Sequence, residues 1–368
     1  MKLSIHTSEL TNVLKHVCRV SIKSAGDYTG QVLLDVTPSC VGISAQNGKQ
    51  QISMSLKRST LTVEATGAIC VNSAKLEQVI SSLPKDKVVT FNLNDEKLQI
   101  TCGRSRFNLA TLPAQNFPAI EFCDENALGA LSLSGGVLST AMRQVGFCAA
   151  RNDVRFFLNG LLFDYSPNTL TLAATDGHRL GVTEVQVDSS VTGQFILPSD
   201  CIEDVATFAG AGQIEVAFNK QMVRFTNETG VLYSRLVDGK FPQYKNHVTN
   251  AALGQVVRVG RSDIASAVAR VTLLSDSKNP AVRLSVKPDT IAIQSISTDV
   301  QNEANDVLPC DYSADPFEIG LNGVLAAELI RSLGGDEVDL TFNGAASGTL
   351  ITTPSYPSHS FVLMPVRL

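Results

Sequence analysis

The stretch of this sequence that most resembles a catalytic motif is Ala-Thr-Asp-Gly-His-Arg-Leu at residues 174–180. Asp176 and His178 are two residues apart, and a carboxylate beside an imidazole can exchange protons with a substrate. The flanking residues 170–173 and 181–185 alternate as strands do, and Asp-Gly between two strands is typical of a hairpin turn. Residue chemistry therefore leaves two interpretations open, a turn at the rim of a binding site or an acid-base centre.

Three other stretches combine apolar with basic or flexible residues. Residues 103–109 (Gly-Arg-Ser-Arg-Phe-Asn-Leu) are typical of an edge strand with a charged outer face, or of a strand that pairs with another subunit. Residues 151–158 (Arg-Asn-Asp-Val-Arg-Phe-Phe-Leu) either hold a nucleic-acid backbone or form a loop that enters a strand at 156–163. The apolar C-terminus at 361–368 either docks into the body of the protein or helps to line a site for partners.

Other motifs of enzymes and metal sites are missing. Gly210-Ala-Gly212 lacks the third glycine of a dinucleotide-binding loop, and no phosphate-loop, zinc-protease, serine-hydrolase or EF-hand pattern occurs. The five histidines show no metal-ligand spacing. We therefore expect no metal and no cofactor. The eight cysteines form no CxxC pair, which predicts buried, reduced thiols in a cytosolic protein; they are Cys18, Cys40, Cys70, Cys102, Cys123, Cys148, Cys201 and Cys310.

The elements that position these stretches belong to an internal repeat. Leu3, Leu131 and Val257 begin the same apolar spacing, so the copies are offset by 128 and 126 residues. Each copy predicts a strand followed by a helix with an i, i+4, i+7 apolar face. The residues in the positions of N-caps are Thr7 or Ser8, Ser134, and Ser262 or Asp263.

A second block repeats in the same register. A predicted helix ends at each of the breakers Pro84, Gly210 and Gly334. Strands follow at 88–91, 214–218 and 338–342, and each leads through a polar turn into another strand. The sequence therefore predicts three units of about 125 residues with two helices and several strands each, an α+β fold rather than a doubly wound sheet.

The composition narrows the class of protein. Of the 368 residues, 44% are hydrophobic and 18% are charged, which excludes a disordered chain. No apolar run reaches the length of a membrane span, and the first residues lack the pattern of a signal peptide. The net charge of -5 argues against nucleic-acid binding that depends on many phosphate contacts.

Several segments together resemble the bacterial DNA polymerase III beta subunit, the sliding clamp family. They are residues 103–113, 153–163, 174–180, 236–242 and 364–368. The likeness extends from residue 1 to residue 368. It implies an α+β fold of three repeats of the DNA clamp (processivity) fold, each with antiparallel sheets outside and two helices inside, which form half of a ring. The clamp domains would be 1–125 (N-terminal), 126–250 (central) and 251–368 (C-terminal).

The resemblance also implies a function without catalysis. Two chains would close head to tail into a ring around duplex DNA, confer processivity on the replicative DNA polymerase and recruit replication and repair proteins. The implied partners are a second copy, duplex DNA, the polymerase catalytic subunit and the clamp loader. Translesion polymerases, mismatch-repair proteins and ligase would bind through short Gln/Leu/Phe motifs. The implied location is cytoplasmic, with no membrane partner.

Three sets of site residues are expected, of which the first carries over by local match with the family. A partner-peptide cleft would contain Leu158, Thr175, Gly177, His178, Arg179, Leu180, Pro242, Asn322, Val362, Met364, Pro365, Val366 and Arg367. The dimer interface would contain Arg104, Arg106, Phe107, Leu109, Leu273, Leu274, Glu303 and Asp306. The residues facing DNA would be Lys15, Arg19, Lys75, Arg143, Arg151, Asn152, Arg155, Arg270 and Arg331.

Helix dimensions favour two chains for such a ring. Six inward helices of about 10 Å width give a circumference of roughly 60 Å and a hole of about 9 Å. Duplex DNA, on the order of 20 Å across, cannot pass through it. Twelve helices leave roughly 28 Å. A closed ring holds DNA topologically, so an acidic net charge is compatible with this function.

The sequence departs from the family pattern at several positions. Leu325 stands where the family often has Tyr, and Asn246 stands where it has a basic residue, so the peptide preference can differ. The loop at 21–30 is short and lacks the family's Pro-Leu-Pro run and arginine. The acidic face expected opposite the two arginines of 103–109 is reduced to Asp299, Glu303 and Asp306.

Two alternatives remain at this point. The departures fit a phage, plasmid or duplicate clamp as well as the main replicative one. An enzyme that uses residues 175–179 on a repeat scaffold is the alternative function.

Overall fold

The chain forms two compact units. The computed structural model describes residues 1–23, 26–57, 61–278, 280–297 and 303–367. Unit 1 comprises Met1–Thr140 and Asp200–Leu236, and unit 2 comprises Ala141–Ser199 and Val237–Leu368. Asp299 and Leu368, which we named above, lie outside the described residues, as do residues 24 and 25 of the short loop.

Unit 1 is built on one antiparallel sheet of 13 strands in the order β10-β15-β16-β17-β4-β3-β2-β6-β9-β8-β7-β1-β5. Its strands are β1 Lys2–His6, β2 Gln31–Val36, β3 Cys40–Gln46, β4 Gln50–Lys57, β5 Leu61–Ala65, β6 Gly67–Asn72, β7 Val88–Asn94, β8 Lys97–Cys102, β9 Ser105–Pro113, β10 Gly129–Ser134, β15 Gln213–Phe218, β16 Met222–Asn227 and β17 Gly230–Arg235. Its helices are α1 Thr7–Val20, α2 Ser73–Ser82 and α4 Ile202–Ala209. Helix α3, Gly135–Gly146, contains the boundary between the units.

Unit 2 contains an eight-stranded sheet in the order β14-β11-β12-β13-β25-β24-β23-β18 and a five-stranded sheet in the order β21-β20-β19-β22-β26. The strands are β11 Gly160–Ser166, β12 Thr169–Thr175, β13 Arg179–Gln186, β14 Gly193–Pro198, β18 Gln255–Gly260, β19 Ala281–Lys287, β20 Thr290–Ser295, β21 Asn305–Pro309, β22 Phe317–Asn322, β23 Glu337–Phe342, β24 Thr349–Thr352, β25 His359–Leu363 and β26 Pro365–Val366. The helices are α5 Tyr244–Ala251, α6 Arg261–Thr272 and α7 Gly323–Ser332.

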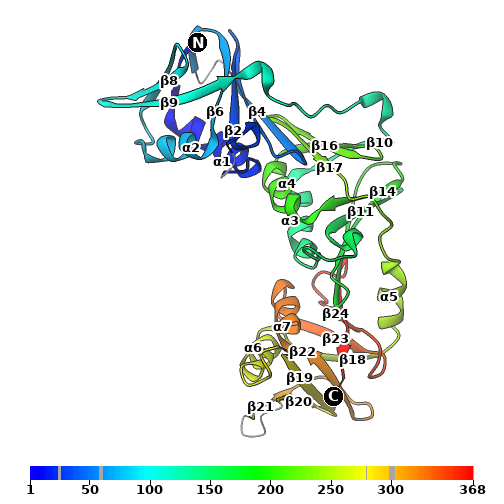
Figure 1. The fold of residues 1–368 in the computed structure, drawn as a ribbon. Helices are drawn as coiled ribbons and strands as arrows, with labels where there is room; N and C mark the ends of the chain where they lie inside the picture. The colour runs from blue at the N-terminus through cyan, green and yellow to red at the C-terminus, as the bar shows by residue number, and fades with distance from the viewer. Residues whose placement is uncertain (24–25, 58–60, 279, 298–302, 368) are drawn as a thin grey trace. The chain divides into compact units, whose positions relative to one another are not determined.

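The repeated apolar patterns correspond to helices that pack on these sheets. Helix α1 buries Leu10, Leu14 and Val17, which are the i, i+4, i+7 positions of the first repeat. Helices α1 and α2 lie next to each other in unit 1, and α6 and α7 do so in unit 2 (Figure 1). The expectation of an α+β fold with antiparallel sheets is confirmed. No helix in the described part of the chain is both long and apolar enough to cross a membrane.

The predicted N-cap side chains are wrong for α1 and α6. The N-cap of α1 is His6 and that of α6 is Gly260, and neither caps its helix through a side chain. Strand β1 runs directly into α1, and the Thr7 backbone N–H donates to the Lys87 carbonyl at 2.9 Å. The N–H of the first helical residue therefore finds its partner in a neighbouring segment.

Strands from different repeats pair with each other inside each unit. In unit 1, β17 pairs with β4, and Gly230 stands opposite Met54. A Cβ atom on Gly230 would lie 2.1 Å from the Ser53 carbonyl oxygen, so only glycine permits this approach. In unit 2, β13 pairs with β25 over five residue pairs, from Arg179–Leu363 to Thr183–His359. Antiparallel pairing thus continues the 13-stranded and the eight-stranded sheet from one repeat into the next.

The structure differs from the sequence prediction in two places. The sequence did not predict helix α5, which buries little more than Tyr244 and Ala251 and so lacks a strong apolar period. We expected a strand from residue 156, but Phe156–Leu158 form a 3-10 turn and β11 begins at Gly160. The Asn159 side chain stabilises the loop before β11, because it accepts the Asp153 backbone N–H and donates to the Asp153 carbonyl, both at 2.8 Å.

The cysteines are free thiols, and five of the eight are buried. Burial raises the pKa of the Cys18 thiol to about 12 and that of Cys201 to about 11, so both are protonated near neutral pH. Cys123 is exposed, and Cys40 and Cys310 are half-buried, so the expectation of buried thiols was wrong for these three.

The buried His359 side chain predicts a fold that weakens in acid. It is 2% exposed, and burial lowers its pKa from 6.5 to about 4, although a hydrogen bond to the Gln144 backbone acts in the opposite direction. Because the pKa is lower in the folded state, protonation favours the unfolded chain. The stabilisation is complete above pH 6.5 and is lost as the pH falls towards 4. We expect the free energy of unfolding to decrease by about 3 kcal/mol across this window through this residue.

Urea denaturation at pH 7.5 and pH 4.5 measures this effect. His359→Leu places a side chain of similar size at this position that does not titrate, so the variant should lose less stability between the two pH values than the natural protein. Equal losses in the two proteins would contradict the assignment to His359.

Candidate functional site

A hollow of about 270 Å³ lies in unit 2 beside the turn at 176–178. Its lining comes from four parts of the chain: the 3-10 turn before β11, the β12–β13 turn, the segment around α5, and the C-terminal strand. The lining residues are Arg155, Phe157, Leu158, Thr175, Gly177, Leu180, Pro242, Tyr244, His247, Val362 and Met364. Most of these side chains are apolar, which suits an apolar ligand.

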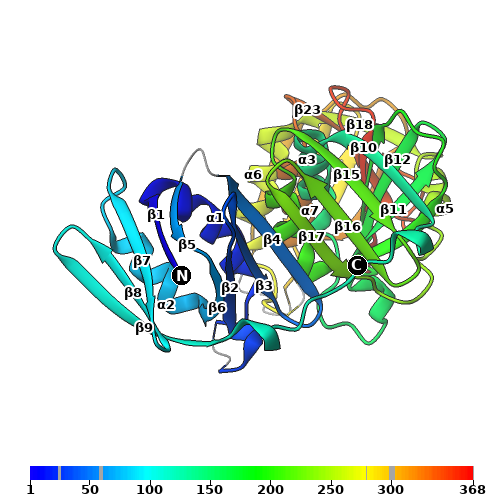
Figure 2. The same cartoon turned by 90° about the horizontal axis from the view of Figure 1, so that it is seen from above.

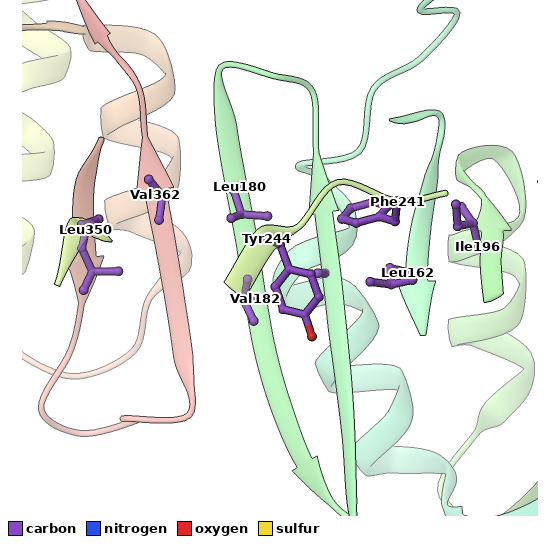
Figure 3. Packing of buried hydrophobic residues seen from close by; sticks show 10 residues of the cluster. Leu162, Leu180, Val182, Ile196, Phe241, Tyr244, Leu350 and Val362 are labelled. Carbon is purple, nitrogen blue, oxygen red and sulfur yellow. The ribbon is translucent and has the colours of Figure 1, made fainter. Parts of the chain in front are cut away.

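The hollow rests on a buried apolar cluster that joins the two repeats of unit 2. The cluster combines Leu180 and Val182 of β13 with Val362 of β25 and with the aromatic pair Phe241 and Tyr244. Figure 3 shows Tyr244 beside Leu180 and Val182 of β13, and Phe241 beside Leu162 and Ile196. The Tyr244 hydroxyl donates to Asp164 Oδ2 at 2.7 Å, so this polar end of the ring has a partner.

The rim of the hollow is a turn held by its own side chains. Asp176 Oδ1 accepts the backbone N–H groups of His178 and Arg179 at 2.8 and 2.9 Å. Thr175 Oγ1 donates to the Arg179 carbonyl at 2.6 Å and accepts the Gly177 N–H at 3.1 Å. Gly177 has a φ of +90°, which side-chain-bearing residues rarely adopt. The prediction of a hairpin turn between two strands is confirmed.

Arg179 connects this turn to two other elements. Its Nε donates to Asp176 Oδ2 at 3.1 Å, one terminal nitrogen donates to Glu328 of α7 at 2.7 Å, and the other donates to the Phe147 carbonyl at 2.9 Å. The guanidinium lies 5.2 Å from the centre of the Phe147 ring. The side chain is 12% exposed.

The C-terminal segment forms one wall of the hollow. Leu180 of β13 pairs with Val362 of β25, and the Met364 N–H donates to the His178 carbonyl at 2.8 Å. Pro365 then pairs with Leu321 of β22, which ties β26 to the five-stranded sheet. Met364 is 39% exposed. The terminus therefore does both things that the sequence allowed, since it docks into the body and also lines a hollow.

The structure brings together most of the residues that we predicted for the cleft. Seven of them line the hollow, namely Leu158, Thr175, Gly177, Leu180, Pro242, Val362 and Met364. His178 and Arg179 lie in the turn at its rim. Pro365, Val366 and Arg367 line a second hollow of about 480 Å³ with Ile319, Gly320, Ala345 and Ala346. Asn322 lines neither, because its side chain caps α7 by accepting the Leu325 N–H at 3.1 Å.

Sequence reasoning missed four lining residues. Phe157, Tyr244 and His247 were not predicted, and Arg155 was predicted to face DNA. Arg155 donates to Asp153 and to the Asp176 carbonyl, and its hydrogen bond lowers the pKa of Asp153 to about 2. Two aromatic residues flanking Pro242 were the available signal for this wall of the hollow.

Strand β9 of unit 1 has an unpaired edge. Ser105–Ala110 pair with β8, whereas pairing with β6 involves Thr111–Pro113 only. In the described part of the chain, the first half of β9 therefore has a partner strand on one side. Arg104 and Arg106 are exposed beside this edge, and Phe107 and Leu109 are half-buried. Figures 1 and 2 both show the β8–β9 hairpin at the periphery of unit 1.

Strand β21 of unit 2 also has an unpaired edge, and acidic residues lie on it or beside it. It is the terminal strand of the five-stranded sheet, and Val307 at its centre is 59% exposed. Leu273 and Leu274, which follow α6, are 81% and 41% exposed and do not belong to the core. Asp306 accepts a hydrogen bond from Arg270 of α6, which keeps the pKa of this carboxyl below its ordinary value. Glu303 is exposed.

The residues predicted to face DNA are exposed, and ion pairs occur among them. Arg19 binds Asp204 at 2.9 Å, Arg155 binds Asp153, and Arg270 binds Asp306. In unit 1, Lys15 and Arg19 share one face of α1, and Lys75 lies in the first turn of α2. In unit 2, Arg143, Arg151, Asn152 and Arg331 are exposed.

Comparison with known families identifies the chain. Family models of the DNA polymerase III beta subunit match residues 1–121 (N-terminal domain), 132–243 (central domain) and 252–367 (C-terminal domain). The chain belongs to the DNA polymerase III beta subunit family. The predicted resemblance and the fold of three clamp repeats are confirmed.

Similar proteins are sliding clamps. The beta sliding clamp of Vibrio cholerae is 30% identical over 373 residues, which covers 100% of both chains. That of Pseudomonas aeruginosa strain PAO1 is 31% identical over 309 residues and 82% of each chain. A solved DnaN sliding clamp from Pseudomonas aeruginosa, bound to griselimycin, superimposes with a TM-score of 0.94 at 27% identity over 100% of both chains.

Leu325 and Asn246, two of the departures from the family pattern, do not line the 270 Å³ hollow. Leu325 is half-buried in the first turn of α7, and Asn246 is exposed on α5, where it donates to Gln243 Oε1 at 3.2 Å. In the short loop, Asp27 accepts the Thr29 N–H at 2.9 Å and begins a 3-10 turn.

Proposed function

We propose that two copies of this chain close head to tail into a ring that encircles duplex DNA, confers processivity on a replicative DNA polymerase and recruits other proteins through the unit 2 hollow. In this proposal the ring has no catalytic activity. We propose a cytoplasmic location, because the DNA of bacteria lies there. Membership in a family of sliding clamps supports the general role.

The observation that carries the ring is the pair of unpaired sheet edges. The first half of β9 and strand β21 both offer free backbone N–H and C=O groups, which makes each a template for another strand. The two strands belong to different units. Each chain can therefore use β9 at one joint of the ring and β21 at the other joint. Arginines at Arg104 and Arg106 and acids at Glu303 and Asp306 give the two edges opposite charge. A head-to-tail contact of this kind closes a ring when the rotation between copies allows it.

We propose that the helices of each repeat line the ring and carry the basic residues that face DNA. The polar faces of α1, α6 and α7 present Lys15, Arg270 and Arg331 to solvent. Pairing with acids weakens the attraction of Arg19, Arg155 and Arg270 for phosphates. Weak contacts suit a ring that must slide, since tight phosphate binding would hold it in place.

The hollow of unit 2 supports a peptide site. Its apolar floor and flexible Met364 suit side chains such as Leu and Phe, and the polar groups at the rim can bond a Gln side chain. The partners we propose are polymerase subunits, the clamp loader, translesion polymerases, mismatch-repair proteins and ligase. We also propose the domain boundaries 1–125, 126–250 and 251–368.

The turn at 175–179 favours binding over catalysis. Both Asp176 carboxylate oxygens accept hydrogen bonds from the turn or from Arg179, so the group serves structure. His178 is exposed at the rim and its backbone carbonyl holds the Met364 N–H. This use of the motif argues against the alternative of an acid-base enzyme.

The dimer interface is tested at the two leucines after α6. Replacing both Leu273 and Leu274 by Ala removes apolar area from each of two joints, about 2 kcal/mol or more per residue if they are buried in the dimer. We expect the double variant to sediment as a monomer at micromolar concentration with an unchanged circular dichroism spectrum. Leu253→Ala is the matched control, since Leu253 is 73% exposed in the same unit and has no predicted contact. A double variant that remains a folded dimer would refute the assignment.

The peptide site is tested at Met364. Met364→Ala should weaken binding of the peptide Gln-Leu-Asp-Leu-Phe by roughly 1–2 kcal/mol if Met364 is an anchor. Removal of residues 364–368 should abolish binding and leave the dimer intact. The unfolding midpoint is measured on the same preparations, with Val324→Ala as control because Val324 is exposed on α7 away from the hollow. Lower stability with unchanged peptide affinity would overturn the site.

A further inference from the structure

We propose that Glu328 of α7 is a positioning residue for the peptide cleft of unit 2. It holds the guanidinium of Arg179, which in turn holds the turn that forms the rim. This role rests on the proposed peptide site, since a turn without a ligand would need no such support.

The contacts of Arg179 make Glu328 one of three supports. The guanidinium donates to Asp176 within the turn, to the Phe147 carbonyl at the end of α3, and to Glu328. The first two acceptors belong to the same repeat as the turn. Glu328 is the one acceptor that comes from a different repeat, so it ties the rim to the helix that packs beside the C-terminal strand.

The turn contacts the cleft through three residues. Gly177 lines the hollow, the His178 carbonyl accepts the Met364 N–H, and Leu180 forms part of the floor. These residues lie on either side of Arg179 or next to it in sequence. If the guanidinium of Arg179 shifts, the rim of the hollow and the wall that Met364 forms should both shift. The pairing of β13 with β25 continues to Thr183 and His359.

Glu328 is more exposed to solvent than Arg179, and this difference distinguishes a positioning role of Glu328 from a role in the stability of the fold. The Arg179 side chain is 12% exposed, and the Glu328 side chain is 46% exposed. Water can reach the position of the carboxylate when it is removed, so the guanidinium keeps a hydrogen-bond partner and the fold survives. Water in place of the carboxylate would not hold the guanidinium in one position. Removal of the Glu328 carboxylate should therefore change the geometry of the rim.

Three variants of Glu328 separate charge from hydrogen bonding. Glu328→Asp keeps the charge on a shorter side chain, Glu328→Gln keeps an acceptor of the same length, and Glu328→Ala removes both. Glu77→Gln is the matched control, because Glu77 forms a 2.8 Å ion pair with Lys23 in unit 1.

The experiment measures two quantities on the full-length protein. Fluorescence anisotropy gives the dissociation constant of labelled Gln-Leu-Asp-Leu-Phe, and hydrogen exchange gives the protection of the amides at 176–180. We expect Glu328→Ala to raise the dissociation constant about fivefold and to speed exchange in the turn, with Glu328→Gln in between and Glu328→Asp nearest the natural protein. The unfolding midpoint of the Glu328 variants should equal that of the natural protein. Glu77→Gln should leave both the dissociation constant and the exchange at 176–180 unchanged.

Two results would overturn the proposal in distinguishable ways. If the natural protein binds the peptide and Glu328→Ala binds it equally well, Glu328 has no positioning role, although the cleft stands. If the natural protein does not bind the peptide, the proposed peptide site itself is wrong, and the role of Glu328 falls with it. A parallel loss of unfolding midpoint and affinity in Glu328→Ala would assign the residue to stability instead.

Discussion

Backbone hydrogen bonding at sheet edges is the constraint on which this structure depends. A strand at an edge exposes N–H and C=O groups that water or another strand must satisfy, and the two larger sheets of this chain continue from one repeat into the next. The chain pairs one repeat with the next at two places, β17 with β4 in unit 1 and β13 with β25 in unit 2. Strands β5, β10, β14, β18, β21 and β26 end their sheets, and the first half of β9 has a partner strand on one side only. In the proposed ring, the first half of β9 pairs with β21 of a second copy.

The cleft is a consequence of one of these pairings. Because β25 pairs with β13, the chain that leaves β25 must pass the β12–β13 turn, and Met364 bonds to His178 there. Tyr244, at the start of α5, packs beside Leu180 and Val182 of β13, and Phe241 packs beside Leu162 and Ile196 (Figure 3). The proposed binding surface thus lies where two repeats meet, as is common for ligand sites at domain junctions. Leu180 and Val362 belong both to the buried cluster and to the lining of the hollow.

The sequence predicted the features that depend on short-range patterns. The repeat, the six helices and the turn at Asp176-Gly177 follow from apolar spacing and turn chemistry, which act over a few residues. It missed α5, whose helix is held by two buried residues rather than by an amphipathic face, and it placed a strand at Phe156 where the Asn159 side chain stabilises a loop. It also missed Tyr244 and His247 as cleft residues and gave Arg155 another role, because packing of distant segments decides these positions. Exposed Leu273 and Leu274 could be proposed only from the resemblance to a family.

Retention on DNA that lacks free ends tests the ring most directly. Labelled protein is loaded onto nicked circular plasmid with the clamp loader of the same organism, and free protein is removed by gel filtration. Half of the complex is then cut at a single restriction site and both halves are filtered again. A topological ring predicts that protein stays with the circular DNA and leaves the linear DNA, at a salt concentration that suppresses phosphate contacts. Protein that stays equally on both forms, or leaves both, would contradict the account.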